Sequence, residues 1–267
     1  MRNFKRILTL CMAGLMMCAA LCVSFAEETE IRLSAPQTEE TPPAEMQTEA
    51  PAEEAAPSAR EQLIDDIIET GRNLFEKANG KLQRAHYAGD IYVCKNFTTY
   101  VFAQNQPKYR LAEFPDAVLA VPANKTKEEC RPYKYGYCWK DVSAAQGNPF
   151  EVAAQFLYDT SLSKAENMER ALAFMRQVKK GDYFQMSADY YYGVGAHSAI
   201  MIADYDAETD SVHWMDSNMA GQSISGIRYG KVQFDAVKKI QWWAEAFCKK
   251  GRGATLYRLR DDIVFAE

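Results

Sequence analysis

Apolar residues recur at helical spacing in three stretches of the chain. The first covers residues 59–83, the second begins at Cys94, and the third follows Ser163. Apolar side chains three and four positions apart are typical of a helix with one face against a core. Gly71 is a point at which the first helix could break. Ser163 and Glu166 form a capping-box pattern, which predicts the start of the third helix.

Short apolar runs between turn residues predict strands in the second half of the chain. The expected strands are residues 183–186, 195–203, 212–218 and 255–260. A short β-type run at 91–93 precedes Cys94, and a strand-like fragment lies at 117–121 in an irregular region, 107–148. Two more helices are expected, one over 149–158 with Pro149 in its first turn and one over 234–249. Gly251 would end the latter.

Two of these strands should form a hairpin, because residues 204–211 between them have turn chemistry. With the turn centred near residues 207–208, the numbers of opposed residues sum to about 415, so His197 lies across from residues 216–218. Alternation places Asp216 and Asn218 on one face and His213 on the other. The best-placed base is therefore His197, with either Asp216 or Asn218 orienting its ring.

Cys94 is the candidate nucleophile. A cysteine in the first turn of a helix lies where backbone N–H groups and the helix dipole favour an anion, which lowers the thiol pKa. The same N–H groups could bind an oxyanion after the sulfur attacks a carbonyl carbon. The alternative is that Cys94 is a small buried apolar residue, as many cysteines are.

The N-terminus has the pattern of a secretory signal peptide. Basic residues precede an apolar run at 7–23, and Ser24 and Ala26 are small residues at the positions that a signal peptidase reads. Cleavage is expected before Glu27, which gives a signal peptide over residues 1–26. The protein is therefore expected to be secreted, either extracellular or associated with the cell wall. We expect no stable insertion in a membrane after cleavage.

Residues 27–57 are rich in Glu, Pro, Ala and Thr and predict a disordered linker. They hold nine of the 36 acidic residues but only one of the 31 basic ones, and three more basic residues lie in the signal peptide. The acidic and basic residues of the remaining segment, 58–267, are thus equal in number. A near-neutral domain argues against nucleic acid as a partner.

Four cysteines remain after signal cleavage: Cys94, Cys130, Cys138 and Cys248. Two disulfides are one interpretation, and a local loop closed by Cys130 and Cys138 with Cys248 simply buried is another. The chain has three histidines and no Cys-x-x-Cys pair, so we expect neither a metal site nor a cofactor.

The order of these features resembles the papain-like CHAP and NlpC-type cysteine amidohydrolases and peptidases. The matching features are a cysteine at a helix start, Gly181-Asp182 opening a strand, the Gly-x-His-Ser-Ala-Ile run around His197, and Asp216-x-Asn218 on the next strand. The match spans roughly residues 89–218. Val-Cys-Lys-Asn replaces the Asp-Cys-Ser-Gly of NlpC-type enzymes, and the insert between Cys94 and His197 is long.

The resemblance implies an α+β, papain-like fold in which the nucleophile helix packs on an antiparallel sheet, with extra helices. It also implies a cysteine hydrolase with Cys94 as nucleophile, His197 as base, and Asp216 or Asn218 as the third catalytic residue. The expected substrate is an amide or peptide bond, first of all in peptidoglycan. The alternatives are a protease or acyltransferase acting on other extracellular amides, and an inactive papain-like domain used for binding or scaffolding.

Overall fold

The structure, a computed structural model, describes residues 56–85, 90–113, 149–186 and 197–266, which belong to one compact unit, Glu54–Glu267. The predicted signal peptide and nearly all of the predicted linker lie outside these ranges, as do His86, the fragment at 117–121, Cys130 and Cys138. Of the helices within the described ranges, none has the length and hydropathy needed to cross a membrane.

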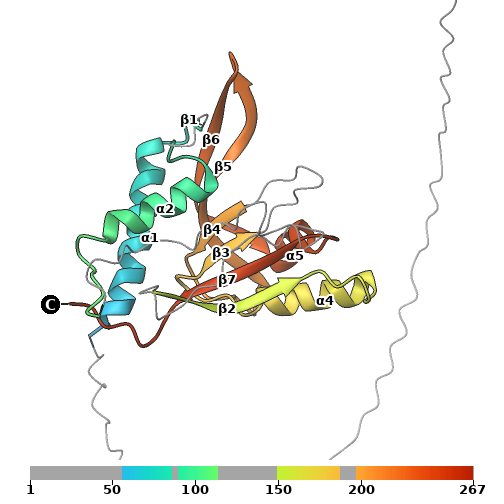
Figure 1. The fold of residues 1–267 in the computed structure, drawn as a ribbon. Helices are drawn as coiled ribbons and strands as arrows, with labels where there is room; N and C mark the ends of the chain where they lie inside the picture. The colour runs from blue at the N-terminus through green and yellow to red at the C-terminus, as the bar shows by residue number, and fades with distance from the viewer. Residues whose placement is uncertain (1–55, 86–89, 114–148, 187–196, 267) are drawn as a thin grey trace, which may run out of the picture. The chain divides into compact units, whose positions relative to one another are not determined.

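The described residues form an α+β structure with helices on an antiparallel sheet (Figure 1). The helices are α1 (Ala59–Ala78), α2 (Cys94–Asn105), α4 (Lys164–Met175) and α5 (Ile240–Phe247). The strands are β1 (Gln83–Arg84), β2 (Phe150–Leu157), β3 (Tyr183–Met186), β4 (His197–Met201), β5 (Ser211–Ile224), β6 (Ile227–Lys239) and β7 (Gly253–Leu259). They form one seven-stranded sheet in the order β1-β6-β5-β4-β3-β7-β2, and every neighbouring pair is antiparallel.

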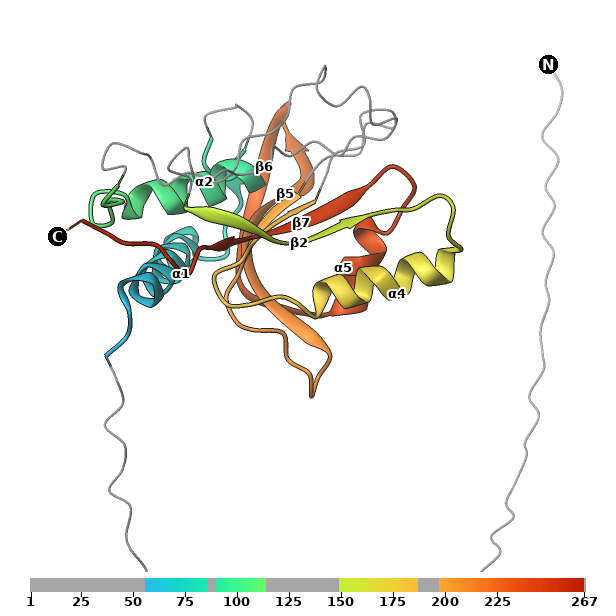
Figure 2. The same cartoon turned by 60° about the horizontal axis from the view of Figure 1, so that its bottom comes forward.

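Each face of the sheet carries its own pair of helices, α1 with α2 and α4 with α5 (Figure 2). Neighbouring residues of one strand divide between the two cores: Tyr183 packs in the α1–α2 core and Phe184 in the α4–α5 core. Ile200 and Met201 divide in the same way. Because both faces are covered, the central strands are apolar at successive positions instead of alternating with polar residues.

Helix α1 runs without a break past Gly71, and Ser58 and Glu61 form a capping box at its start. A Cβ at Gly71 would lie 2.0 Å from the Met215 sulfur, so the missing side chain lets the helix approach β5 closely. Gly181 has a φ of +88° in the turn before β3 and lies against Ile64 of α1. The helix was predicted, but the function of Gly71 is close packing and not a kink.

One predicted helix is a strand. Residues Phe150–Leu157 form β2, which pairs with β7 along its whole length. Phe150, Ala154 and Phe156 are buried while Val152 and Leu157 are exposed. Pro149 suggested a helix start, but cross-strand pairing with β7 decides the conformation here.

The β5–β6 hairpin was not predicted, because the sequence indicated a strand over residues 212–218 and a helix over residues 234–249. β5 continues to Ile224, turns at Ser225 and Gly226, both with positive φ, and returns as β6 to Lys239. The helix expected over residues 234–249 is therefore only α5, and Val237 is exposed on β6 instead of buried on a helical stripe. The end of the hairpin projects beyond the rest of the sheet (Figure 1).

Candidate active site

Cys94 is the first residue of α2, as predicted, and Val93 is the N-cap in extended conformation. Val93 offers no capping side chain to the helix start. Residues 91–93 form a turn instead of the expected strand. The Tyr92 carbonyl accepts a 2.8 Å hydrogen bond from the Ser217 hydroxyl, which ties the segment before the cysteine to β5. The nucleophile candidate is thus held between a helix start and the sheet.

His197 is the first residue of β4 and lies at the strand end that faces Cys94. The predicted register of the hairpin is confirmed, since the paired positions Ile200–Met215 and Met201–Trp214 each sum to 415. On its other side β4 pairs with β3, with His197 opposite Met186. The side chain of His197 is buried and hydrogen bonds to the Cys94 thiol.

Asp216 is the third member of this cluster. Its Oδ2 lies 2.7 Å from His197 Nε2, and its side chain is almost completely buried. This hydrogen bond leaves Nδ1 of the ring as the nitrogen available to the thiol. Asn218, the alternative candidate, is exposed two residues further along β5, opposite Lys231 on β6. The structure therefore brings Cys94, His197 and Asp216 together, and Asn218 lies outside the cluster.

The Asp216 carboxylate accepts two further hydrogen bonds. Trp214 donates its indole N–H to Oδ2 at 3.2 Å, and Gln233 donates its amide to Oδ1 at 2.9 Å. Trp243 of α5 stacks on the His197 ring with a centroid distance of 5.9 Å. The sequence analysis singled out neither Trp243 nor Gln233 as a site residue, and Gln233 lies on the unpredicted strand β6.

Electrostatics in the cluster favour a thiolate and an imidazolium. Burial by itself would raise the pKa of Cys94, but the hydrogen bond and charge of His197 and backbone hydrogen bonds from Ser198 and Lys95 outweigh it and lower that pKa. Burial opposes the charged form of His197, yet hydrogen bonds and charges of Asp216 and Cys94 raise its pKa to about 9. The proton thus favours the ring over the sulfur.

Lys95 adds a second positive group beside the cysteine. Its ammonium lies 5.9 Å from the centre of the Tyr183 ring, and burial lowers its pKa to about 8, opposed by the charge of Cys94. Together with the uncapped start of α2, this lysine creates a local field that favours an anion at the sulfur.

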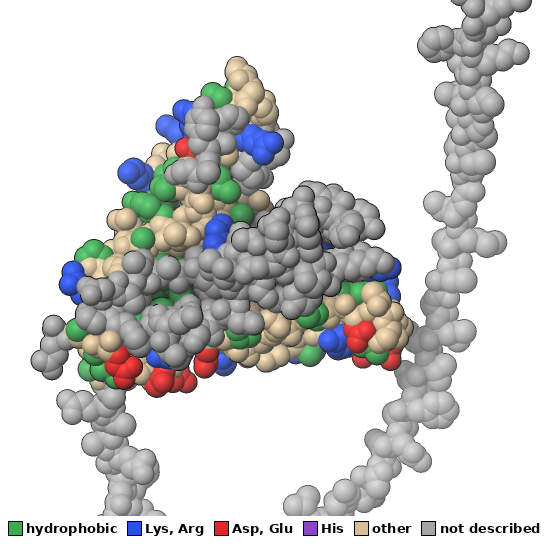
Figure 3. Space-filling view, in the orientation of Figure 1, with side chains coloured by type: hydrophobic (Ala, Val, Ile, Leu, Met, Phe, Trp, Pro, Cys, Tyr) green, Lys and Arg blue, Asp and Glu red, His purple; other side chains and the backbone are tan. Residues whose placement is uncertain are grey.

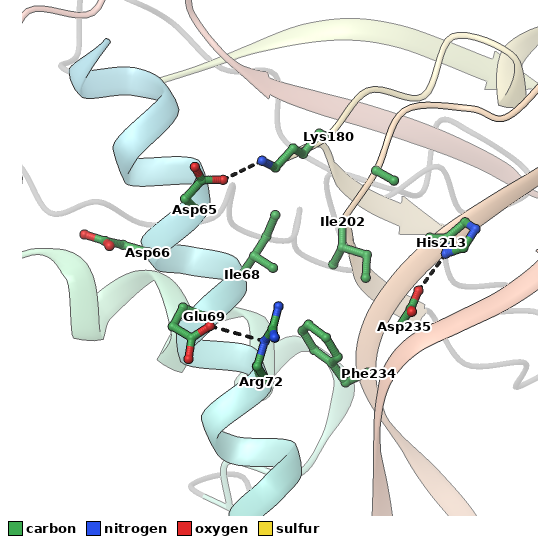
Figure 4. A pocket seen from close by; sticks show the side chains of 11 residues that line it. Asp65, Asp66, Ile68, Glu69, Arg72, Lys180, Ile202, His213, Phe234 and Asp235 are labelled. Carbon is green, nitrogen blue, oxygen red and sulfur yellow. Dashed lines mark hydrogen bonds and ion pairs between the residues drawn. The ribbon is translucent and has the colours of Figure 1, made fainter. Parts of the chain in front are cut away.

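His213 lies elsewhere, as the strand alternation predicted. Its ring pairs with Asp235 at 2.6 Å beside a groove of about 530 Å³ between α1 and the β5–β6 hairpin (Figure 4). The other charged groups there are also paired: Lys180 with Asp65, Arg72 with Glu69, and Asp66 with Lys108 of the segment after α2. Because its charged side chains are paired with groups of opposite sign, this groove offers no surface of a single charge to a ligand.

The two described cysteines form no disulfide: Cys94 is partly exposed, and Cys248 is buried, as one interpretation of the sequence expected. The loop closed by Cys130 and Cys138 lies outside the described residues. In the described ranges, no three His, Cys, Asp or Glu side chains lie close enough to hold a metal ion together. Basic side chains gather around the projecting β5–β6 hairpin in Figure 3. Arg228 and Lys231 are exposed residues of β6.

Comparisons with known proteins give no relative for this chain. No family model matches it, and neither a search of curated proteins nor a search of solved structures found a match.

Proposed function

We propose that the protein is an exported cysteine hydrolase with a papain-like catalytic domain that cleaves amide or peptide bonds. The observation that carries the proposal is the hydrogen-bonded series from the Cys94 thiol through the His197 ring to the Asp216 carboxylate. A nucleophile within hydrogen-bond reach of a base, which a third group orients, is the arrangement that acyl transfer needs. The start of α2 adds backbone N–H groups beside the sulfur.

In the first half of the reaction, the Cys94 thiolate attacks the carbonyl carbon of the amide. The carbonyl electron pair moves onto oxygen, and N–H groups at the start of α2 would stabilise that charge. When the intermediate collapses, the C–N bond breaks and the His197 imidazolium gives its proton to the leaving amine. An acyl group then remains on the sulfur as a thioester.

In the second half, neutral His197 takes a proton from a water molecule, and the resulting hydroxide attacks the thioester carbonyl. The C–S bond breaks, the carboxylic acid leaves, and Cys94 returns as a thiolate beside the imidazolium. Asp216 accepts the hydrogen bond of Nε2–H throughout and so keeps Nδ1 directed at the sulfur and the water. No metal or cofactor has a part in these steps.

We propose peptidoglycan as the substrate. Two features of the sequence support this: the secretory signal pattern and the order of motifs shared with CHAP and NlpC-type enzymes. The basic side chains of the hairpin are a third, because Arg228 and Lys231 would attract the carboxylates of peptide stems. Nucleic acid is not part of the proposal, and neither is stable insertion in a membrane.

The test is incubation of purified peptidoglycan with the reduced protein, followed by measurement of newly released amino groups. Cys94→Ser is the matched control, since it keeps the shape of the site and replaces the sulfur by a far weaker nucleophile. We expect release by the wild type and a loss of at least 10³-fold in the variant. In parallel, iodoacetamide labelling of Cys94 is measured from pH 5 to 10.

The two measurements together separate the possible functions. Labelling that is already fast near pH 6, without release from peptidoglycan, would point to a protease or acyltransferase for other extracellular amides. Labelling that rises only near the ordinary thiol pKa of ~8.5 would contradict hydrolysis. The domain would then be a papain-like binding or scaffolding module.

A further inference from the structure

We infer that Gln233 is a positioning residue for the proposed reaction, acting through Asp216 by fixing the carboxylate in the rotamer that serves His197. The inference rests on the proposed thiol chemistry of the site. Gln233 does not touch His197 through any described hydrogen bond. Its amide donates to Asp216 Oδ1 at 2.9 Å, while His197 Nε2 and Trp214 Nε1 share Oδ2 at 2.7 and 3.2 Å.

A β-bulge places the glutamine there. Trp214 pairs with Ala236, but Asp216 pairs with Gln233, so β6 advances three residues while β5 advances two. Without the extra residue, Phe234 would lie opposite Asp216 and offer it no hydrogen bond. Asp235, inside the bulge, has a φ of +51°. Bulges beside functional sites often redirect a side chain in this manner.

The three donors differ in what they can control. A carboxylate can rotate about its last torsion, and His197 and Trp214 restrain that rotation only through one oxygen, Oδ2. Gln233 binds that other oxygen, and its own backbone is fixed in the strand pair. The Asp216 side chain is 2% exposed, so water has little access to replace the amide. The glutamine therefore adds a restraint at the oxygen that His197 does not use, and so helps to hold Oδ2 toward the His197 ring.

The experiment is a double-mutant cycle of Gln233→Met and Asp216→Asn, with the rate constant for iodoacetamide labelling of Cys94 at pH 6.5 as readout. Methionine has nearly the same length and removes the donor. We expect Gln233→Met to slow labelling about 3- to 30-fold, and to have almost no further effect in the Asp216→Asn background, because the glutamine acts through that carboxylate. Circular dichroism verifies that each variant is folded.

Gln241→Met is the matched control, because Gln241 also donates to a carboxylate at 2.9 Å, that of Glu245, on the exposed side of α5. Its labelling rate should stay within twofold of wild type. Gln233→Glu is a second variant: two carboxylates would face each other, force a proton onto the pair and slow labelling more than methionine does.

Three results would overturn the inference. If Cys94 is labelled at the wild-type rate in the folded Gln233→Met variant, the inference is refuted and the proposed hydrolase function is unaffected. Additive effects of the two substitutions would show that Gln233 acts independently of Asp216. Slow labelling of Cys94 in the wild type, unaffected by His197→Ala, would remove both the inference and the proposed function.

Discussion

Two histidine–aspartate pairs lie on the same part of the sheet and have nearly the same length. His197 and Asp216 are 2.7 Å apart, and His213 and Asp235 are 2.6 Å apart. In the first pair the side chains are 11% and 2% exposed, and in the second they are 31% and 58% exposed. Distance therefore does not distinguish a candidate catalytic pair from an ordinary surface pair.

What differs is the surroundings of each ring. The His197 ring contacts a thiol through its second nitrogen and an indole through its face, and its carboxylate partner takes two more donors. The His213 pair borders a groove, and both of its side chains are open to solvent (Figure 4). A buried pair in a low dielectric can shift the protonation of a neighbour, whereas an exposed pair contributes little.

The largest difference should appear when each histidine is removed. His197→Ala takes away the charge and hydrogen bond that hold the thiol pKa down, so labelling of Cys94 at pH 6.5 should slow about 100-fold, to the rate of an ordinary thiol. His213→Ala should stay within twofold of wild type. Iodoacetamide labelling followed by mass spectrometry measures both. If Cys94 is labelled at the same rate in His197→Ala and His213→Ala, the two histidines do not differ in their effect on the thiol and the comparison fails.

The two aspartates should differ in their effect on stability. Asp216→Asn loses a charge that accepts hydrogen bonds from His197, Trp214 and Gln233, and turns an amide N–H₂ toward one of these donors. We expect a loss of about 2–3 kcal/mol in the free energy of unfolding. Asp235→Asn changes an exposed pair and should cost less than about 1 kcal/mol. Urea titrations at pH 7 measure both. A larger loss for Asp235→Asn would show that burial is not the deciding factor.

The pH dependence of stability offers a finer comparison. The pKa of His197 is raised from 6.5 to about 9, so its stabilisation is fully present below pH 6.5 and is lost as the pH rises through about 9. The pKa of Cys94 is lowered, so its stabilisation is present above the ordinary thiol pKa and is lost as the pH falls through the lowered pKa. In the wild type, the loss of stability from His197 and the gain from Cys94 as the pH rises therefore partly cancel in the free energy of unfolding.

Cys94→Ala removes the contribution of the cysteine to the pH dependence of stability and leaves that of His197. Its free energy of unfolding should fall as the pH rises above 6.5, by at most about 1.4 kcal/mol per pH unit, and more steeply than that of wild type. The fall should end below pH 9, because the thiolate no longer raises the His197 pKa. His213→Ala, as the control, should follow the wild-type slope. Urea titrations from pH 6 to 9 provide the curves, and parallel curves for wild type and Cys94→Ala would contradict a coupled pair.

The smallest expected effect concerns salt. A double-mutant cycle on His213 and Asp235 at pH 6 should give a coupling energy of about 0.2–1 kcal/mol that disappears near 1 M salt. The same cycle on His197 and Asp216 should depend much less on salt, since solvent ions do not reach the buried pair. Thermal or urea unfolding in low and high salt measures this, and a strong salt dependence of the buried pair would contradict its burial.

Much of the site was predictable because it depends on local chemistry and on one hairpin. The turn residues at 204–211 set the register, and this register puts His197 across from residues 216–218. The apolar stripe after Cys94 predicted the helix that begins there. Such features follow from periodicity and turn preference, which a single segment contains.

The choice between Asp216 and Asn218 was not predictable in this way. Both side chains leave the same face of β5, so alternation cannot separate them. The contact with His197 depends on how β4 and β5 lie together at the strand end, and the partner of the carboxylate depends on the bulge in β6. β6 itself was missed because its paired neighbour, and not its own pattern, stabilises a strand there.

The sequence alone determined that a cysteine begins a helix and that a histidine begins a strand whose hairpin partner carries Asp216. These features depend only on residues that are close to one another along the chain. The tertiary structure decided that the thiol meets the ring, that Asp216 and not Asn218 is its partner, and that Gln233 and Trp243 support the pair. Those contacts join α2, β4, β5, β6 and α5, and the relative placement of such distant segments arises only when both faces of the sheet are packed.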